Sequence, residues 1–570
     1  MIANVDLFST EACRPPAPPL GRRPSATDLL YRGVRAQEDR DTRAAARVAG
    51  VAQPGWHMIR IRLPLGALTP DQYLALDCLS ERVTYNHSLR ATAGQSLQLH
   101  GVAPADLEGA LATIRGAGLA AGCNPDGLEY AVVAPPAPFA QPGYLRLRAL
   151  ARELCDGLYP TPWDEAAHPD HPPRKFTIGL GLVADNSTNV FAQDVGLVLV
   201  ERPGAAPRVN VLVGGGLSMP GRRPGSYARV ATPLGSVSGD EVLPTVRGLS
   251  ALFRQLGQIE RRRFTRFKYV VEALGVEALR AAVEARLGWR LGPWIAVGPY
   301  GARAWLGRHA QGDGRVFCGI KVPNGRIMDV GQRRYKAALR AAVEAYRPTL
   351  IITPGQDVIL GGLRPHDADG VEAVLAAYHV PFGAGLPPVR AAAMACAGLP
   401  TCPLALAESE RVTERLLPEL ERALARVGRA GAPFVVRISG CGLGCIRPNM
   451  VDLGLVGRKP GRYDLFVGGE ESSGRLGELY AESVPVEEVL PTVEPLLTYW
   501  GCWAAPGESF SAFYQRRFGP ATLPTRLESV NGPPARPRLE AALRAAHRGA
   551  EPAKGGRRPE TEPIPQNNLL

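Results

Sequence analysis

The feature that most constrains the fold of this chain is a long internal repeat. Four short segments recur in the same order about 260 residues later in the 570-residue sequence. The pairs are IRLPLGAL (from Ile61) with IKVPNGRI (from Ile320), TAGQSLQLHG (from Thr92) with TPGQDVILGG (from Thr353), DVGLV (from Asp194) with DLGLV (from Asp452), and NVLVGG (from Asn210) with DLFVGG (from Asp464). A period of this length indicates a duplicated pair of domains and not a solenoid.

Each copy mixes strand and helix patterns. Alternating runs such as MIRIRL and FCGIKV, and apolar runs that end in glycine such as VNVLVGGG and YDLFVGG, predict strands. The segments PDQYLALDCLSERV and GVEAVLAAYHV predict helices, as does the stretch from Thr245 to Arg290 between the copies. The fold class expected from this mixture is α+β.

Composition indicates a soluble protein of several domains. The chain is 45% apolar, and we find no apolar run of membrane-helix length and no secretory signal, so we expect a cytoplasmic protein without membrane contact. The net charge of +12 comes mostly from arginine. This positive charge could bind nucleic acid, could steer an acidic partner or an anionic ligand, or could only reflect a base composition that favours arginine codons. No nucleic-acid-binding motif supports the first, so we expect no nucleic acid partner.

The two ends of the chain differ from the repeats in composition. The N-terminal arm is rich in proline, and the tail from about Pro533 consists largely of Pro, Arg, Glu and Gly. Such a composition predicts a disordered tail, with one short helix expected at LEAALRAAH.

Four of the ten cysteines form two close pairs, and both pairs lie in the second copy of the repeat. They are Cys396 and Cys402 in CAGLPTC, and Cys441 and Cys445 in CGLGC. Four thiolates suit either tetrahedral zinc or an iron–sulfur cluster. The wide, unequal spacings and the flexible glycines at 442 and 444 favour the cluster, although the spacing alone leaves zinc open. The six scattered cysteines (Cys13, Cys78, Cys123, Cys155, Cys318 and Cys502) are expected to be buried hydrophobes or incidental thiols.

The segments around these cysteines resemble the signature of sirohaem-dependent sulfite and nitrite reductases. The resemblance rests on MACAGLPTCPLALAESER followed by SGCGLGCIRPNMVDLGLVGRKPGRYDLFVGG. It extends over about residues 28–505 through RGVRAQEDRDTR, PPRKF, DNSTNVFAQDVGLVLV and VNVLVGGGLS, which come in family order. The family is itself an internal duplication, and the pattern is nearer to its sulfite reductase branch.

The resemblance implies a fold of two ferredoxin-like half-domains and two α+β domains that bind sirohaem and a [4Fe–4S] cluster. The implied divisions are an N-terminal arm (1–55), half-domain 1 (56–135), a sirohaem-binding domain (136–300), half-domain 2 (301–385), a cluster and sirohaem domain (386–505) and a C-terminal extension (506–570). It also implies that Cys396, Cys402, Cys441 and Cys445 hold the cluster, and that Cys445 bridges it to the sirohaem iron.

The implied activity is a six-electron reduction, of sulfite to sulfide or of nitrite to ammonia. Electrons would come from a separate ferredoxin or flavoprotein, because no flavin or NADPH domain is visible. By family position, Arg60 and Lys175 would contact a small anionic substrate, and Arg90, Thr92, Gln98 and His100 would contact the sirohaem. On the residues alone, Arg60 and Arg90 could instead pair with surface acids, and His100 could be an ordinary buried strand histidine.

Several family positions differ in this chain. The family pocket has two arginines and two lysines, but Glu129 stands at the second arginine, and no arginine occurs between Arg115 and Arg146. The K-F-K pair reads Lys175-Phe176-Thr177, T-N-R-Q reads Thr92-Ala93-Gly94-Gln95, and C-P-N-G-C reads CGLGC. We therefore expect a sulfite or nitrite reductase with a variant pocket, with two alternatives. These are an enzyme redirected to another substrate, for example in specialised metabolism or of the precorrin-3B synthase type, and a relative that only transfers electrons.

Overall fold

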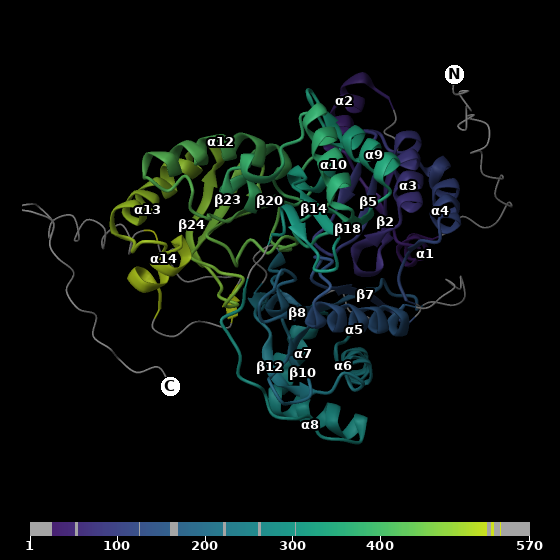
Figure 1. The fold of residues 1–570 in the computed structure, drawn as a ribbon, viewed down its shortest axis with the longest axis vertical. Helices are drawn as coiled ribbons and strands as arrows, with labels where there is room; N and C mark the ends of the chain where they lie inside the picture. Colours follow the sequence, from purple (N-terminus) through teal and green to yellow (C-terminus); the bar gives the residue numbers. More distant parts are fainter. Residues whose placement is uncertain are drawn as a thin grey trace, which may run out of the picture.

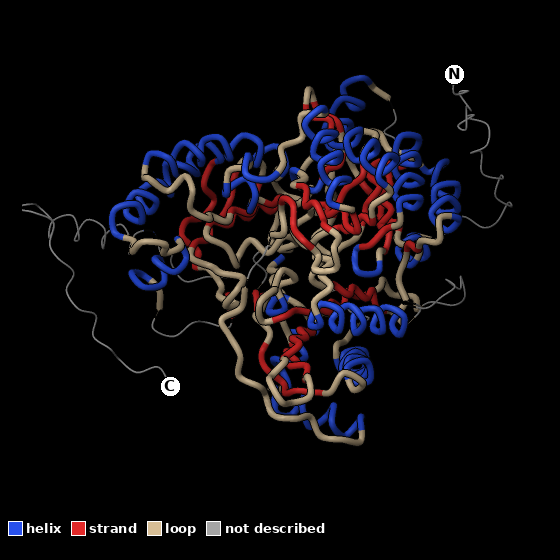
Figure 2. The backbone as a smooth tube through the Cα atoms, in the orientation of Figure 1, coloured by secondary structure: helices blue, strands red, loops and turns tan. Residues whose placement is uncertain are grey.

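The computed structural model describes residues 25–51, 55–124, 126–159, 169–220, 224–259, 264–301, 304–520 and 526–528, together with Arg536. Three lobes meet at the centre of the molecule (Figure 1). The two half-domains form one lobe, the rest of the first repeat forms the second, and the rest of the second repeat forms the third. Each lobe has its own cluster of buried apolar side chains. Helices lie mostly on the outside and strands inside (Figure 2).

The two half-domains have the same strand order, and each sheet is completed by a strand of the other. The first sheet has the order β1-β2-β5-β4-β15, with β6 beside β2, and the second has the order β13-β14-β19-β18-β3. The strands of the first are β1 (Val34–Gln37), β2 (Trp56–Arg62), β5 (Leu97–Val102), β4 (Leu89–Ala91), β15 (Arg326–Ile327) and β6 (Ala120–Ala121). Those of the second are β13 (Gly307–Ala310), β14 (Val316–Ile320), β19 (Val358–Leu363), β18 (Thr349–Ile352) and β3 (Ala67–Leu68). The exchanged strands, β3 and β15, end the IRLPLGAL and IKVPNGRI repeats.

The other two lobes also share one topology. Their sheets have the orders β12-β10-β9-β8-β7 and β24-β23-β22-β21-β20, and in each the last three strands are parallel. The first contains β7 (Leu128–Val133), β8 (Arg174–Leu182), β9 (Val195–Val200), β10 (Arg208–Val213) and β12 (Thr232–Val237). The second contains β20 (Met394–Ala395), β21 (Val436–Ser439), β22 (Leu453–Lys459), β23 (Arg462–Val467) and β24 (Glu478–Pro485). The repeat inferred from the sequence is therefore a repeat of structure.

Helices cover the outer faces of these sheets (Figures 1 and 2). Those of the half-domains are α1 (Ala26–Tyr31), α2 (Arg40–Ala49), α3 (Pro70–Val83), α4 (Leu107–Gly116), α9 (Tyr335–Tyr346) and α10 (Pro365–Ala377). Those of the first repeat are α5 (Pro142–Leu158), α6 (Val242–Leu256), α7 (Phe267–Leu274) and α8 (Val276–Leu287). Those of the second repeat are α11 (Pro388–Ala392), α12 (Glu410–Arg426), α13 (Val489–Trp503) and α14 (Phe510–Phe518).

Two short ribbons complete the described strands. Strand β16 (Asp329–Val330) pairs with β17 (Arg333–Arg334) within the second half-domain. Strand β25 (Arg526–Glu528), from the C-terminal extension, pairs with β11 (Tyr227–Arg229) of the first repeat.

The α+β class and the helix and strand patterns named above are confirmed. The stretch from Thr245 to Arg290, for example, forms α6, α7 and α8. The most N-terminal residues and the helix expected at LEAALRAAH lie outside the described residues. Within the described part of the chain, no helix is both long and apolar enough to cross a membrane.

The exchange of strands predicts an unusual sensitivity at Gly66. Gly66 has φ +71°, and a Cβ there would lie 2.4 Å from the carbonyl oxygen of Ile352 in the other half-domain. Gly50 has a similar φ of +67° with nothing within 4 Å, so it is a matched control. We expect Gly50→Ala to lower the free energy of unfolding by about 1–2 kcal/mol, and Gly66→Ala to lower it by at least twice as much. Denaturant titration followed by circular dichroism measures both, and equal losses would contradict the role of the interface.

Candidate functional site

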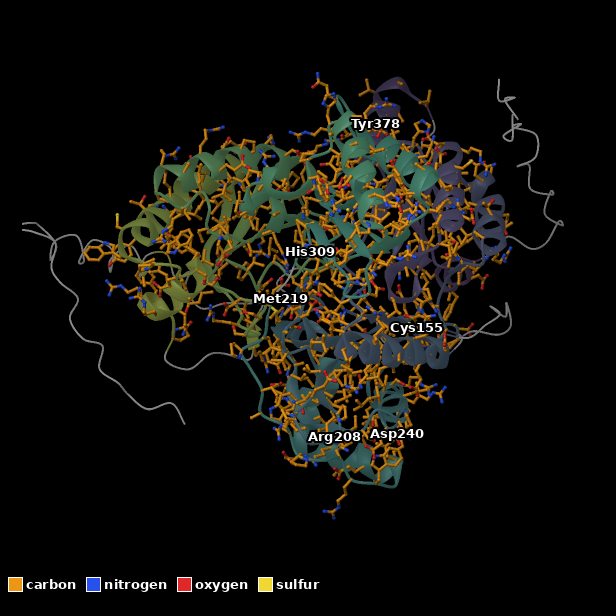
Figure 3. The ribbon with its side chains drawn as sticks, in the orientation of Figure 1. Cys155, Arg208, Met219, Asp240, His309 and Tyr378 are labelled. Carbon is orange, nitrogen blue, oxygen red and sulfur yellow. The ribbon has the colours of Figure 1, made fainter. Side chains whose placement is uncertain are left out.

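A cavity of about 710 Å³ lies where the three lobes meet. Its lining comes from the half-domains, mainly the first, from strands β7 and β8, loops and the start of α7 in the first repeat, and from the cysteine loops of the second repeat. Met219, labelled near the centre of Figure 3, belongs to a first-repeat loop at this junction. Segments from most of the chain length therefore contribute to one site.

All four paired cysteines line this cavity. Cys396 directly follows β20, and Cys441 and Cys445 follow the neighbouring parallel strand β21. The carboxyl ends of parallel strands meet at one edge of a sheet, so two loops far apart in sequence come together here. The Gly440 N–H donates to the Cys396 sulfur over 3.1 Å, and the Ser409 hydroxyl lies 3.3 Å from it. Cys445 is open to the cavity, although it lies deep inside the molecule.

The positions of the four cysteines differ from a compact site for one ion. Among the described residues, no three His, Cys, Asp or Glu side chains lie close enough together to ligate a single metal ion. The four sulfurs instead share the wall of a much larger space.

The two glycines between Cys441 and Cys445 are required by close packing of the backbone. A Cβ on Gly442 would lie 2.2 Å from the Met219 carbonyl oxygen, and one on Gly444 would lie 3.0 Å from that of Leu217. The Met219 N–H donates to the Gly442 carbonyl over 2.5 Å. The loop of the first repeat thus holds the cysteine loop of the second directly, backbone against backbone.

A row of polar side chains crosses the first half-domain sheet on the cavity side. Arg60 on β2 is opposite Gln98 on β5, Gln98 is opposite Arg90 on β4, and Arg90 is opposite Arg326 on β15. Strand residues alternate between faces, so their apolar neighbours Ile59, Ile61, Leu97 and Leu99 enter the core instead. The exchanged strand β15 therefore adds the fourth member of the row.

Glu410, the first residue of α12, connects this row to the cysteine loops. Its carboxylate accepts from Arg90 Nε at 3.0 Å and from Arg326 Nη2 at 3.0 Å. Arg326 also lies 3.3 Å from His100 Nδ1, and His100 Nε2 lies 3.0 Å from Gln98 Oε1. Burial, followed by the charges of Arg326 and Arg90, lowers the pKa of His100 well below its usual value. A neutral ring that accepts at Nδ1 and donates from Nε2 satisfies both contacts.

Glu129, the acid at an expected arginine position, also lines the cavity. It lies on β7 opposite Lys175 on β8, accepts from Arg35 over 2.6 Å, and forms a short ion pair with Arg60. Burial opposes its ionisation, but the charges of Arg60, Arg35 and Lys175 prevail and lower the pKa of Glu129 to about 2. Arg60 and Arg90 thus pair with acids, which was the alternative expected from the residues alone. The acids lie inside the molecule, however, and not on its surface.

Thr177, where the family has a lysine, helps to position another cation. Its hydroxyl and its N–H both donate to Asp194 Oδ2 over 2.8 Å. Arg266, which lines the cavity, donates to the same oxygen over 2.8 Å. Lys175 is open to the cavity, but desolvation inside the molecule, followed by the charges of Arg60 and Arg266, lowers its pKa.

The sequence-predicted site residues all lie in this one cavity: Arg60, Arg90, Thr92, Gln98, His100, Lys175, Cys396, Cys402, Cys441 and Cys445. Sequence reasoning missed several further cations of the lining: Arg35, Arg62, Arg174, Arg266 and Arg447. Among the described lining residues Glu129 is the single carboxylate. Arg35 lies in the family block RGVRAQEDRDTR and could have been found there, whereas Arg266 lies in an arginine-rich run without a distinctive motif.

Of the scattered cysteines, Cys155 and Cys318 are buried, while Cys78 and Cys502 are exposed. Cys123 is buried at the margin of the cavity, and Cys13 lies outside the described residues.

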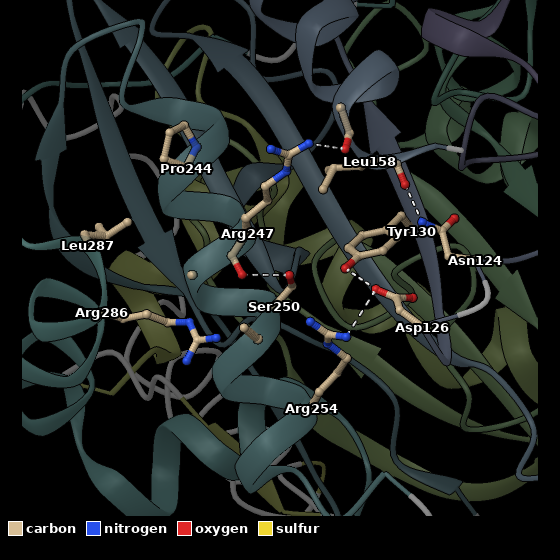
Figure 4. A pocket seen from close by; sticks show the side chains of 13 residues that line it. Asn124, Asp126, Tyr130, Leu158, Pro244, Arg247, Ser250, Arg254, Arg286 and Leu287 are labelled. Atoms are coloured by element: carbon tan, nitrogen blue, oxygen red, sulfur yellow. Dashed lines mark hydrogen bonds and ion pairs between the residues drawn. The ribbon is translucent and has the colours of Figure 1, made fainter. Parts of the chain in front are cut away.

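A second, more open pocket of about 420 Å³ lies behind β7, between α6 and the turn at Asp126 (Figure 4). Its Arg247 donates to the Gly157 carbonyl over 2.8 Å, and its Arg254 lies 3.9 Å from Asp126. In Figure 4 these guanidinium groups point in different directions, and the lining includes no cysteine. The larger cavity is therefore the candidate functional site.

Comparisons with known proteins agree with this geometry. The model described as the nitrite/sulfite reductase ferredoxin-like half domain matches residues 51–117 and 308–378, which are the two half-domains. The model described as the nitrite and sulphite reductase 4Fe-4S domain matches residues 162–291, in the first repeat. The solved structure of Mycobacterium tuberculosis NirA matches with a TM-score of 0.69 and 20% identity, covering 86% of this chain and 89% of that one.

Curated relatives match over nearly the whole chain. The Synechococcus elongatus "Sulfite reductase [ferredoxin]" is 33% identical, over 93% of this chain and 90% of that protein. The Nitrobacter hamburgensis "Sulfite reductase [NADPH] hemoprotein beta-component" is 32% identical, over 85% and 87%. With a duplicated fold, matched half-domains and relatives of this coverage, the chain belongs to the nitrite and sulphite reductase family.

Proposed function

We propose that this protein is an oxidoreductase that uses sirohaem and a [4Fe–4S] cluster to reduce sulfite to sulfide, with electrons from a separate donor. The observation that carries the proposal is one cavity that combines four cysteines with seven arginines and a lysine: Arg35, Arg60, Arg62, Arg90, Arg174, Arg266, Arg447 and Lys175. The family membership and the sulfite reductases among the relatives support it.

The residues of the cavity fit both cofactors. Cys396, Cys402, Cys441 and Cys445 line the cavity and would provide the four thiolates of a cluster, and Cys445 would also ligate the sirohaem iron. Sirohaem carries eight carboxylates, and burial of such an anion requires cations and hydrogen-bond donors. The cavity offers these, including the Nε of Arg60, which is buried without a hydrogen-bond partner.

The cofactors supply the electrons at the reacting anion, and the chain supplies position and charge. Six electrons and seven protons convert sulfite to hydrogen sulfide anion and three waters. Arg60 and Lys175 are proposed to hold the substrate oxygens, and Arg90, Thr92, Gln98 and His100 are proposed to hold the macrocycle. Arg90 is fixed by Glu410 and His100 by Gln98 and Arg326, so this part of the wall is preorganised.

The activity is tested with reduced viologen as an artificial electron donor. The purified protein, reconstituted with both cofactors, should oxidise reduced viologen when sulfite is added and release one sulfide for every six electrons consumed. Absorbance of the viologen and a colorimetric sulfide assay measure the two quantities. A fully loaded protein that turns over no sulfite, nitrite or hydroxylamine would contradict the proposal.

The cluster assignment is tested by substitution of one ligand. Cys402→Ser should abolish the cluster, since it removes one of four ligands, and should reduce the iron and acid-labile sulfide of the purified protein to a small fraction of the wild-type values. Cys502→Ser is a matched control because Cys502 is an exposed residue of α13 outside the cavity. Metal and sulfide analysis measures the result. One zinc per chain in the wild-type protein would support the zinc alternative instead.

The electron donor is proposed to be an acidic ferredoxin or flavoprotein that docks beside the cysteine loops. Leu404 and Leu406, next to Cys402, are 64% and 38% exposed. Arg411 and Arg415 on the adjacent start of α12 are 52% and 60% exposed at their side chains, and both pair with Glu408, while Arg411 also pairs with Asp41. Carboxylates of an acidic partner would replace these surface acids beside the exposed leucines, at the loop that would hold the cluster.

Charge reversal on α12 tests the docking surface. The double substitution Arg411→Glu and Arg415→Glu should raise the KM for an acidic ferredoxin by about tenfold or more, because the charge changes by four units. Activity with reduced viologen should remain close to wild type. Arg426→Glu, near the far end of the same helix and 55% exposed, is the control. If steady-state kinetics gave the same rise in KM for the double variant and for the Arg426→Glu control, the donor would dock elsewhere.

A further inference from the structure

The cavity contains a carboxylate where its other charged side chains are cations. Glu129 has a side chain that is 12% exposed, and it lies between Arg60 and Arg35, with Lys175 opposite on the neighbouring strand. The two arginines hold its pKa at about 2, so it is anionic at any working pH. Three cations and one fixed anion therefore surround this part of the site.

The fixed anion affects ligands in proportion to their charge. The electrostatic energy of a bound ion is its charge multiplied by the local potential. A reduction of the positive potential therefore weakens the binding free energy of a dianion twice as much as that of a monoanion. Glu129 also occupies guanidinium groups of Arg60 and Arg35 that would otherwise face a ligand. Sulfite is a dianion, whereas hydrogensulfite and nitrite are monoanions.

We propose that Glu129 is a specificity-determining residue that lowers the preference of this cavity for the sulfite dianion relative to singly charged oxyanions, hydrogensulfite or nitrite. The inference rests on the proposed function and specifies how the charge of the substrate affects its binding. It assigns to Glu129 a role in substrate selection and none in electron or proton transfer.

Glu129→Gln tests the proposal because glutamine keeps the size of the side chain and removes the charge. Affinity is measured at equilibrium, from the change in visible absorption when sulfite or nitrite is added to the oxidised holoprotein. The pH is set well above the second pKa of sulfurous acid, so that sulfite is the dianion. A tenfold gain for nitrite should then accompany about a hundredfold gain for sulfite. Equal gains for both anions, or no gain for sulfite, would overturn the proposal.

Two controls separate charge in the cavity from loss of an ion pair. Glu272 also lies between two arginines, accepting from Arg229 at 3.1 Å and Arg526 at 2.8 Å, and it is not among the cavity-lining residues. Glu272→Gln should leave the ratio of sulfite to nitrite affinity unchanged. Glu129→Asp keeps the charge and should keep the ratio within about threefold of wild type. A ratio changed to the same extent in Glu272→Gln and Glu129→Gln would refute a specific role for Glu129.

Turnover with reduced viologen provides a second readout. Above the second pKa of sulfurous acid, kcat/KM for sulfite divided by that for nitrite should be about tenfold higher in Glu129→Gln than in the wild-type protein, and the two ratios should converge well below that pKa, where hydrogensulfite is a monoanion. Equal ratios in the two proteins at high pH would overturn the proposal while leaving the sulfite reductase assignment intact. Absence of turnover with both anions would instead overturn the proposed function.

Discussion

Strand β15 of the second half-domain pairs with β4 of the first, and β3 of the first pairs with β18 of the second. The site depends on this exchange. It brings Arg326 next to Arg90 in the first sheet, although the two residues are far apart in the chain. Gln95 reinforces it from the first half-domain, because its amide donates to the Ile352 carbonyl over 3.1 Å and accepts from the Ala134 N–H over 2.7 Å. The half-domains and the first repeat are thereby held as one unit around the cavity.

Charge compensation is the second constraint on the site. An interior that contains so many cations would be unstable without partners, because an isolated buried charge is costly. Each partner carboxylate comes from another segment: Glu410 binds Arg90 and Arg326, Asp194 binds Arg266, and Glu471 binds Arg437 and Arg447. These pairs fix the directions of the guanidinium groups before any cofactor binds. The free-energy cost of ordering these guanidinium groups therefore falls on folding and not on cofactor binding.

The family resemblance and the pocket chemistry describe different levels of the same protein. The two half-domains match the ferredoxin-like half domain of the family, and the four cysteines, Arg60 and Arg90 line the cavity that this fold creates. Glu129 and Thr177 also line this cavity, and each bonds to a neighbour within the protein. The chain thus retains the fold of its family while the charged groups that face its cavity include a carboxylate.

The sequence alone determined the duplication, the α+β class and the two cysteine pairs, because repeats, apolar periodicity and short motifs are properties of neighbouring residues. The resemblance also placed Arg60, Arg90, His100 and Lys175 in one site, and the structure brings them to one cavity. Only the tertiary structure decided how their charges are balanced. Glu129 meets Arg60 and Arg35, and Thr177 meets Asp194 beside Arg266, through strands and loops that the sequence separates. Local patterns carry no information about such pairs, because the contact is made by side chains whose distance is set by the packing of whole lobes.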